Sequence, residues 1–530
     1  MINRGINNPK EARIFLDTGT SALLDPYSFR DMIQAVALVK KAALDKKKVM
    51  IFGDYDVDGL TAVAVLKKTL ERLGIDSLHY IPHRIKEGYG LIKNILHLAK
   101  DKQVKLLITV DCGINSVSEV ESLRKHDIEV ILTDHHEPVN PEKLPLASAI
   151  INPKIKNSNY KYRDLAGVGV AYKLCQALLG EDLKDYLDLV ALGTIADVVP
   201  LTGENRIIVK EGLKSITQTK NLGLKALMES SGIKGKPVTP TFVSYILGPR
   251  LNASGRMATA DIALELLLSS DEGRAKELAG LIEGYNRQRQ KVENHILEEA
   301  QGLIDREINF KEHKIIVIAK EDWHQGVLGI VASKLADRFY RPTILISLSE
   351  DLCKGSGRSI KNFHLFDALV GCSQYLDSFG GHSHAVGLLI TKDNIADFKH
   401  SINNFAQKKL LLEDLLPSLE VDMELGLADL SEDLVGELER LEPFGTGNPE
   451  PLFYTRNLTL KNTPQALGRD TLKFWVNDGE VTCQAIGFGM ASLRQGLIDA
   501  GSFDLIYSLR IDNWQGESSF ILEAEDIFFK

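Results

Sequence analysis

Three aspartates at alternating positions close a short apolar run in the first tenth of the chain. Residues 48–53 precede Asp54, Asp56 and Asp58, and the apolar segment 60–66 follows them. The first run predicts a buried parallel strand and the second predicts a packed helix. Because like charges crowded at a strand end repel one another, the arrangement is costly unless cations neutralise it. The cluster therefore favours a hard divalent ion such as Mg²⁺ or Mn²⁺.

A calcium loop and a solvated acidic turn are two other interpretations of this motif. A calcium loop of the EF-hand type needs a bidentate glutamate at its twelfth position, where this chain has Val65. That interpretation is therefore excluded. A solvated acidic turn stays open on this segment alone.

The same pattern, an apolar run that ends in polar residues, recurs twice. Residues 105–110 precede Asp111, and residues 129–133 precede Asp134–His136. Helical segments alternate with these runs, which predicts an α/β fold with a doubly wound parallel sheet. In such sheets ligands gather outside the carboxyl ends of the strands. We therefore expect these acids and histidines to meet at one edge.

A fourth acid, Asp197, follows the apolar stretch 187–196, and we expect it at the same edge of the sheet. A neutral imidazole from His135 would add a nitrogen donor, which suits Mn²⁺ better than Mg²⁺, although both ions fit.

Eight motifs carry a family resemblance. Four resemble the metal motifs of the DHH phosphoesterases: Asp54–Gly59, Val110–Gly113, Asp134–His136 and Ala196–Leu201. Four more are similar to the branch of that family that degrades single-stranded DNA from its 5′ end: Gly248–Arg256, Trp323–Gly329, Gly355–Ser359 and Phe379–His382. Each motif alone is weak evidence, but their joint order and spacing are specific. The resemblance covers nearly the whole chain.

The resemblance implies a fold of several domains. It predicts a doubly wound parallel-sheet DHH domain, a long connecting helix, a second α/β DHH-associated domain and a C-terminal OB-like β-barrel. The expected segments are a helical N-terminal extension (1–45), the DHH catalytic domain (46–239), a connecting helical segment (240–312), the DHH-associated domain (313–416) and the OB-fold domain (417–530).

The implied activity is two-metal hydrolysis of single-stranded DNA to 5′ mononucleotides, in DNA repair and recombination. By resemblance, Asp54, Asp56 and Asp111 hold one Mn²⁺ or Mg²⁺ ion, and Asp58, Asp111, His135 and Asp197 hold the other. Asp134 would orient the histidines, and His136 would contact the phosphate. The residues expected to bind DNA are Arg84, Arg250, Arg256, Ser356, Gly357, Arg358 and His382.

One position departs from the family pattern. Many DHH enzymes have a histidine where this chain has Phe52, and Asp54 is the substitute ligand that we expect. Two alternative functions stay open: a DHH phosphoesterase of short oligonucleotides or cyclic dinucleotides, and an inactive single-strand-binding scaffold. The first would need no C-terminal barrel, and the intact acids argue against the second.

Three further segments yield structural expectations. Residues 278–303 predict a long helix whose exposed face holds Arg287, Gln288, Arg289 and Lys291. Gly355–Ser359 predicts a glycine-rich turn that could present backbone N–H groups to a phosphate. Short β-like runs from residue 451 onward predict a small barrel, in which Phe474, Trp475 and Trp514 could stack on bases or, more commonly, fill the core.

Composition sets the remaining limits. The chain has 530 residues, a formal charge of −9 and five scattered cysteines without a CxxC pair, which fits a reducing, cytoplasmic environment. No apolar run approaches the roughly 20 residues that span a bilayer, so we expect no membrane partner. The run Lys46–Lys48 is expected to be solvated. A single-strand-binding protein and a helicase stay open as protein partners.

Overall fold

The computed structural model describes residues 1–349, 352–468, 470–512 and 519–530. These residues form two compact units. One contains residues 24–197 and 212–417, and the other contains residues 1–23, 198–211 and 418–530. This division differs from the predicted domains because it groups the first 23 residues with the C-terminal barrel. Trp514, a candidate for base stacking, lies outside the described residues.

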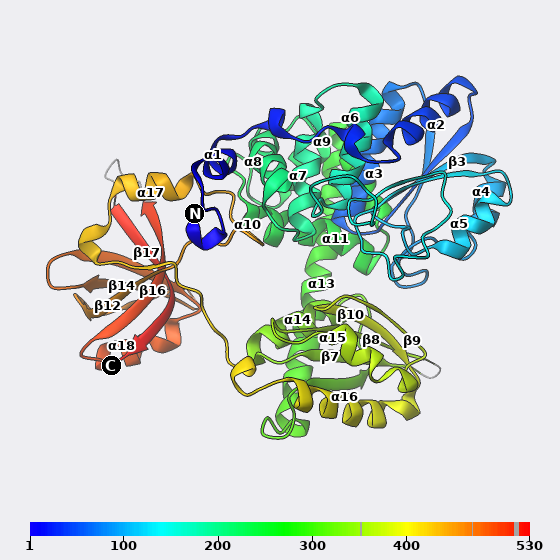
Figure 1. Cartoon of the computed structure of the whole chain (residues 1–530). Coiled ribbons are helices and arrows are strands. Elements are labelled where there is room, and N and C mark those ends of the chain that lie inside the picture. Colours follow the sequence, from blue (N-terminus) through cyan, green and yellow to red (C-terminus); the bar gives the residue numbers. More distant parts are fainter. Residues whose placement is uncertain (350–351, 469, 513–518) are drawn as a thin grey trace. The chain divides into compact units, whose positions relative to one another are not determined.

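The larger unit contains a five-stranded parallel sheet of order β2-β1-β3-β4-β5. Figure 1 labels its central strand, β3. Its strands are β1 (Lys48–Gly53), β2 (Ser77–Tyr80), β3 (Val104–Val110), β4 (Glu129–Thr133) and β5 (Ala149–Ile151). The order reverses between β1 and β3, which is the topological switch point where ligands bind in doubly wound sheets. The predicted parallel α/β fold is confirmed.

Helices surround this sheet and continue the chain beyond it. They are α2 (Met32–Leu44), α3 (Val57–Arg72), α4 (Ile95–Asp101), α5 (Val117–Arg124), α6 (Gly167–Leu179), α7 (Leu187–Ala196), α9 (Leu222–Ser230), α10 (Pro240–Phe242), the π-helix η5 (Val243–Leu247), α11 (Gly248–Met257) and α12 (Asp261–Leu268). Asp197 follows the helix α7 and not a strand, so the apolar stretch before it is helical. It reaches the sheet edge because α7 packs against α3.

The predicted long helix is α13 (Glu272–Glu307), which contacts α9, α11 and α12 and then α14 (Leu328–Phe339). Arg289 was expected on its exposed face but is buried. Its guanidinium is 2.6 Å from both Glu293 Oε2 and Asn286 Oδ1. Polar partners on the same helix allow this charge to be buried, which periodicity of apolar residues could not indicate.

The second sheet has the order β6-β7-β8-β10-β9, in which β6 and β7 are parallel and the other pairs antiparallel. Its elements are β6 (Ile316–Glu321), β7 (Thr343–Leu348), β8 (Cys353–Arg358), β9 (Ser378–Gly381), β10 (Ala385–Ile390), α15 (Leu365–Val370) and α16 (Ile395–Lys409). The turn predicted at Gly355–Ser359 was wrong, because these residues mostly form β8. A Cβ on Gly355 would lie 2.8 Å from Leu388, so tight packing in the sheet requires this glycine.

The smaller unit is built on a seven-stranded sheet of order β11-β12-β16-β17-β15-β14-β13, and a β12–β14 pairing closes it into a barrel. Its strands are β11 (Met423–Glu424), β12 (Phe453–Leu460), β13 (Gln465–Leu467), β14 (Thr471–Asn477), β15 (Thr482–Phe488), β16 (Phe503–Asp512) and β17 (Ser519–Phe529). Its helices are α1 (Pro9–Asp17), α17 (Glu432–Glu439) and α18 (Arg494–Asp499), and α8 (Gly203–Thr217) begins in this unit.

Arg206 on α8 joins the three chain segments of the smaller unit. Its guanidinium donates to the carbonyl oxygens of Phe15, Leu441 and Arg440 at 2.7–3.0 Å and lies over the Phe15 ring. Burial lowers the pKa of Arg206 to about 10. The charge is thus held by three carbonyl dipoles, which explains why the first residues of the chain fold with its last hundred.

The contact between α3 and α7 requires a glycine. A Cβ on Gly193 of α7 would lie 2.2 Å from Thr61 Oγ1 and 3.1 Å from Asp58 Oδ1, both on α3. We expect Gly193→Ala to push these helices apart and to destabilise the fold by about 1–3 kcal/mol. Gly284→Ala is the control, because nothing lies within 4 Å of that position on α13. Thermal unfolding measures both variants, and equal melting temperatures would contradict this account of the packing.

Candidate metal centre and anion-binding group

The ends of β1 and β3 bring the predicted acids together at the switch point. Asp54 directly follows β1, and Asp111 directly follows β3. Asp56 caps α3 by accepting a hydrogen bond from the N–H of Gly59 at 3.1 Å, and Asp58 lies in the first turn of that helix. Asp111 has a φ of +60°, a strained conformation for a residue with a Cβ. Such strain is typical of functional sites.

Three groups of side chains have ligand atoms that all lie within 4.8 Å of one another. They are Asp54, Asp56 and Asp111; Asp58, His135 and Asp197; and Asp111, His135 and His136. Phe52 belongs to none of them, because its side chain has no atom that binds a metal. It is fully buried, and its ring stacks on Tyr80 with centroids 5.6 Å apart. The structure therefore brings together all six residues that we expected to bind metal.

Several atoms of these groups are buried without a hydrogen-bond partner among the described residues. They are Asp54 Oδ1, Asp111 Oδ1, Asp197 Oδ2 and both ring nitrogens of His135. Leaving such atoms buried and unpaired is costly. Carboxylate oxygens with an imidazole nitrogen form a donor set that Mn²⁺ or Mg²⁺ could satisfy, so the residues fit the expected ions.

The pKa values of these side chains also favour a bound cation. Burial, followed by the charge of Asp56, raises the pKa of Asp54 to about 8 and that of Asp58 to about 7. Burial and neighbouring carboxylates also raise the pKa values of Asp111 and Asp197 well above the usual range. Burial lowers the pKa of His135, so its imidazole is neutral and can donate a lone pair.

The start of α6 shapes this centre, a role that we did not expect from the sequence. The N–H groups of Gly167 and Val168 donate to Asp58 Oδ2 and Oδ1 at 2.7 and 2.8 Å. A Cβ on Gly167 would lie 2.4 Å from Asp111 Oδ1. Only glycine allows this backbone to approach both acids, and the sequence Gly167-Val-Gly169 was the available signal.

Asp134 holds the two histidines from behind. Its carboxylate accepts hydrogen bonds from the N–H groups of Ile114, His135 and His136, and from His136 Nδ1 at 2.8 Å. Burial alone would raise the pKa of Asp134, but His136 and these N–H groups outweigh it and the pKa is lowered. Burial alone would lower the pKa of His136, but Asp134 outweighs it and the pKa is raised. Both pKa shifts favour an ion pair between His136 Nδ1 and Asp134 Oδ1, which are 2.8 Å apart.

Two more side chains approach His136. The Tyr89 hydroxyl lies 2.9 Å from His136 Nδ1 and donates to the carbonyl oxygen of Asp111 at 3.3 Å. The ring of His382 is nearly parallel to that of His136, with centroids 6.0 Å apart. Tyr89 was missed by sequence reasoning, although the sequence Gly88-Tyr-Gly90, with φ of +81° and +86° at its glycines, marks an irregular loop.

A group of cations lies beside the acids. Burial and the nearby charges of Arg84, Arg358 and Arg289 lower the pKa of Arg256 well below its usual range. Burial and Arg84 likewise lower the pKa of Arg358. Arg84 lies over the Tyr55 ring at 4.5 Å, and Arg256 Nη1 donates to the carbonyl oxygen of Gly326 at 2.7 Å. Mutually repelling guanidinium groups of this kind are stabilised by a bound anion.

Ser356 and Arg358 meet the start of α14. A Cβ on Gly329 would lie 2.9 Å from Ser356 Oγ and 3.1 Å from Arg358 Nη2. Backbone N–H groups at a helix N-terminus favour anions, and here a hydroxyl and a guanidinium stand next to them. Gly357 lies in β8 between β7 and β10, where its Cα packs against Leu365 and Val386.

Arg250 is the predicted DNA-binding residue that the structure does not place with the others. Its Nε lies 2.8 Å from Glu283 Oε2, and its Nη1 donates to the carbonyl oxygen of Ile246 at 2.9 Å. The carboxylate partner lies on α13, so Arg250 makes a helix-to-helix contact, and its role in DNA binding stays a prediction.

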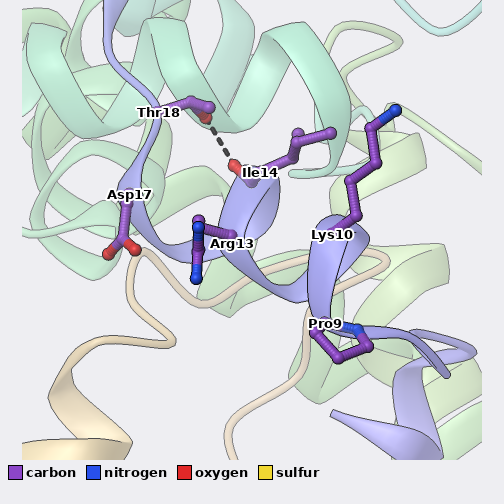
Figure 2. A pocket seen from close by; sticks show the side chains of 6 residues that line it. All are labelled: Pro9, Lys10, Arg13, Ile14, Asp17 and Thr18. Carbon is purple, nitrogen blue, oxygen red and sulfur yellow. Dashed lines mark hydrogen bonds between the residues drawn. The ribbon is translucent and has the colours of Figure 1, made fainter.

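A cavity of about 560 Å³ lies elsewhere, along α1. Figure 2 shows the side chains that line it: Pro9, Lys10, Arg13, Ile14, Asp17 and Thr18. None of the predicted site residues lines this cavity, and the Thr18 hydroxyl is bound to the carbonyl oxygen of Ile14. The chemistry therefore resides in the acid cluster and not in this cavity.

Comparison with known proteins agrees with this arrangement. Three family models match: the DHH family, N-terminal domain (residues 48–194), the DHHA1 domain (312–408) and the RecJ OB domain (421–526). The single-stranded-DNA-specific exonuclease RecJ of Haemophilus influenzae is 35% identical over 99% of this chain and 94% of its own length. The chain belongs to the RecJ family. RecJ of Bacillus subtilis is 38% identical over 99% of this chain and 67% of its own length.

Solved RecJ structures share the fold. The structure of Thermus thermophilus RecJ in complex with Mn²⁺ matches all of this chain and 75% of that chain, with a TM-score of 0.83 and 30% identity. The corresponding complex with Mg²⁺ matches with a TM-score of 0.79 and 29% identity. The predicted succession of DHH domain, long helix, DHHA1 domain and OB domain is thus confirmed.

The raised pKa values predict a pH dependence of stability in the absence of metal. Asp54 and Asp58 keep their protons up to about pH 7–8 in the folded protein but lose them near pH 4 when unfolded. Stability should therefore fall as the pH rises from about 4 to about 8, and Mn²⁺ should restore more of it at pH 8 than at pH 6. Melting temperatures with EDTA and with Mn²⁺ measure this effect.

Asp54→Asn provides the control for this prediction, because an amide does not titrate. The EDTA curve of this variant should be flatter than that of the unmodified protein. A metal-free melting temperature that rises over the same pH range would contradict the assignment of buried, protonated carboxyls.

Proposed function

We propose that this chain is a metal-dependent exonuclease that hydrolyses single-stranded DNA from its 5′ end to 5′ mononucleotides, in DNA repair and recombination. The observation that carries the proposal is the set of buried, unpaired carboxylate and imidazole atoms beside a group of repelling arginines. The names of its RecJ relatives, single-stranded-DNA-specific exonucleases, support the substrate class.

The residues divide between two ions. Asp54, Asp56 and Asp111 would hold one ion, and Asp58, His135 and Asp197 the other. Asp111, whose Oδ1 lies 3.2 Å from His135 Nε2, would be shared between the two. When bound, two Mn²⁺ or Mg²⁺ ions acidify the attacking water and neutralise charge on the phosphate. The RecJ structures with Mn²⁺ and with Mg²⁺ support both metals.

The protein itself orients and neutralises the substrate. Because Asp134 engages Nδ1 of His136, the Nε2–H of that ring is the donor left for a phosphate oxygen. His382, parallel to it, offers a second imidazole to the same group. Arg84 and Arg256 supply fixed positive charge that is neutralised when the phosphate binds.

The hydrogen-bond donors at the start of α14 would set the direction in which the strand is degraded. A terminal phosphate carries more charge than an internal diester, and Gly329, Ser356 and Arg358 offer it N–H, hydroxyl and guanidinium donors. With a 5′ phosphate held there, the metal centre would cut the first diester. The strand would then be shortened from its 5′ end.

The barrel would hold the rest of the strand. Trp475 on β14 is 36% exposed and could stack on a base, whereas Phe474 is buried in the barrel core. A barrel is not needed for hydrolysis of short oligonucleotides or cyclic dinucleotides, so it argues against that alternative. The unpaired metal-ligand atoms argue against an inactive scaffold.

Cellular context completes the proposal. The five cysteines are free and buried, which suits the reducing cytoplasm. No described helix is long and apolar enough to cross a membrane. A helicase, which produces single strands, and a single-strand-binding protein, which coats them, are the classes of partner that would supply the substrate.

The metal assignment predicts the effect of Asp111→Asn. Because this side chain belongs to two of the three ligand groups, its loss should lower hydrolysis by about a thousandfold or more. Release of labelled mononucleotides in Mn²⁺ measures the rate, and circular dichroism checks the fold. Asp305→Asn, an exposed position on α13, is the control and should keep full activity. A variant at Asp111 with more than about a tenth of the original rate would overturn the assignment.

The phosphate pocket predicts a substrate preference. Strands with a 5′ phosphate should be degraded about 10–100 times faster than strands with a 5′ hydroxyl, because of the charge-assisted bonds to the phosphate. Arg358→Ala should remove most of this preference without loss of bound Mn²⁺. Arg338→Ala, at the exposed end of α14, should leave the preference unchanged. Degradation from the 3′ end, or a preference that survives Arg358→Ala, would rule out this pocket.

A further inference from the structure

A second cationic region lies at the opposite edge of the first sheet. Because β1, β3 and β4 are parallel and adjacent, the turns that precede them lie side by side. We call these turns, together with the helix ends and strand starts that flank them, the basic edge, which is made of residues 40–48, 100–105 and 124–129. Lys48 Nζ, at the start of β1, lies 3.3 Å from Gln103 Oε1, just before β3, which shows how close the turns are.

The basic edge is strongly positive in a chain of net charge −9. Its three segments contain ten lysines and arginines against four acids, and all fourteen side chains are exposed. In the part of the chain that the structure describes, Lys40, Lys41, Lys46, Lys100 and Lys105 have no carboxylate within ion-pair distance. Lys47, Lys102 and Lys125 are paired with Asp45, Asp101 and Glu121.

Helix capping does not account for this charge. The helices α2, α4 and α5 end at the basic edge, and cations near a helix C-terminus are favourable. However, backbone N–H groups already bind their last carbonyl oxygens, for example Lys47 N to Ala42 O and Gln103 N to Lys100 O. Three helix ends also offset only about one and a half charges in total, at roughly half a charge each. About four positive charges are left over.

We infer that the basic edge is a second nucleic-acid contact, which binds the sugar–phosphate backbone of a segment that is not being cleaved. The inference rests on the proposed function, because the substrate is then a polyanion long enough to reach this edge. The six residues of β1, at about 3.3 Å each, separate the edge from Asp54 by about 20 Å. A strand whose end is in the metal centre could thus touch the edge only with a distant part or with an adjoining duplex.

The surface suits a backbone and not base recognition. Lysine is a compact, flexible cation that neutralises phosphates without geometric selection. No Phe, Tyr or Trp occurs in the three segments, so stacking on bases is not offered there. The contact should therefore be independent of sequence and strongly dependent on salt.

The test compares two triple variants of the full chain. Lys41→Gln/Lys46→Gln/Lys105→Gln removes three unpaired charges of the basic edge. Lys220→Gln/Lys225→Gln/Lys236→Gln is the matched control, with three exposed lysines of the same unit that have no ion pair among the described residues. Fluorescence anisotropy, in the Asp111→Asn background, measures the affinity for three probes over a range of salt: a 3-nucleotide strand, a 40-nucleotide strand and a strand joined to a duplex.

We expect the basic-edge variant to bind the long probes about tenfold more weakly, with a log–log salt slope smaller by about two to three. Its affinity for the short strand should be unchanged, and so should the affinities of the control for all three probes. A larger loss on the 40-nucleotide strand would identify single strand as the ligand, and a larger loss on the joined probe would identify duplex.

Equal slopes for the two variants would overturn the inference. So would an equal loss of affinity for the short strand, which reaches only the metal centre. Hydrolysis of the short strand by the unmodified protein is measured in a separate assay. If no hydrolysis occurred, the proposed function would be wrong, and the binding comparison would still test the basic edge.

Discussion

The structure depends on keeping several carboxylates buried within a few ångströms of one another. Asp54, Asp58 and Asp111 are almost fully buried, and each raises the energy of the others when ionised. The fold reduces this cost with oriented dipoles, such as the N–H groups of Gly167 and Val168 on Asp58, and leaves other oxygens free. The remaining cost is what divalent cations would offset, so the same feature that destabilises the metal-free protein would provide its metal affinity.

Charge is distributed unevenly along the chain. Residues 411–450 contain twelve acidic residues and a single arginine, so the rest of the chain carries a small positive net charge. The net charge of −9 is therefore no obstacle to DNA binding. Arg84, Arg256 and Arg358 provide fixed positive charge near the acids, and α13 connects the two sheet regions through ion pairs such as Arg250–Glu283 and Lys334–Glu293.

Much of the candidate site could be predicted because it is local. Asp54, Asp56 and Asp58 belong to one loop between a strand and a helix, and parallel-sheet topology brings Asp111 and Asp134 to the same edge. The predictions failed where packing overrode local chemistry. The glycines of Gly355–Ser359 indicate a turn, but neighbouring strands leave no room for a side chain. Arg289 is polar and yet buried because its partners are on the same helix.

The sequence by itself determined the alternation of strands and helices, the type of metal ligand and the membership of an α/β class, because each depends on residues close together in the chain. Only the tertiary structure decided which cations serve the acids. Arg84 and Arg358 are brought beside Arg256, whereas Arg250 is paired with Glu283. It also revealed Tyr89, the N–H groups of α6 and the basic edge. Those depend on contacts between segments distant in sequence, whose distances no local pattern encodes.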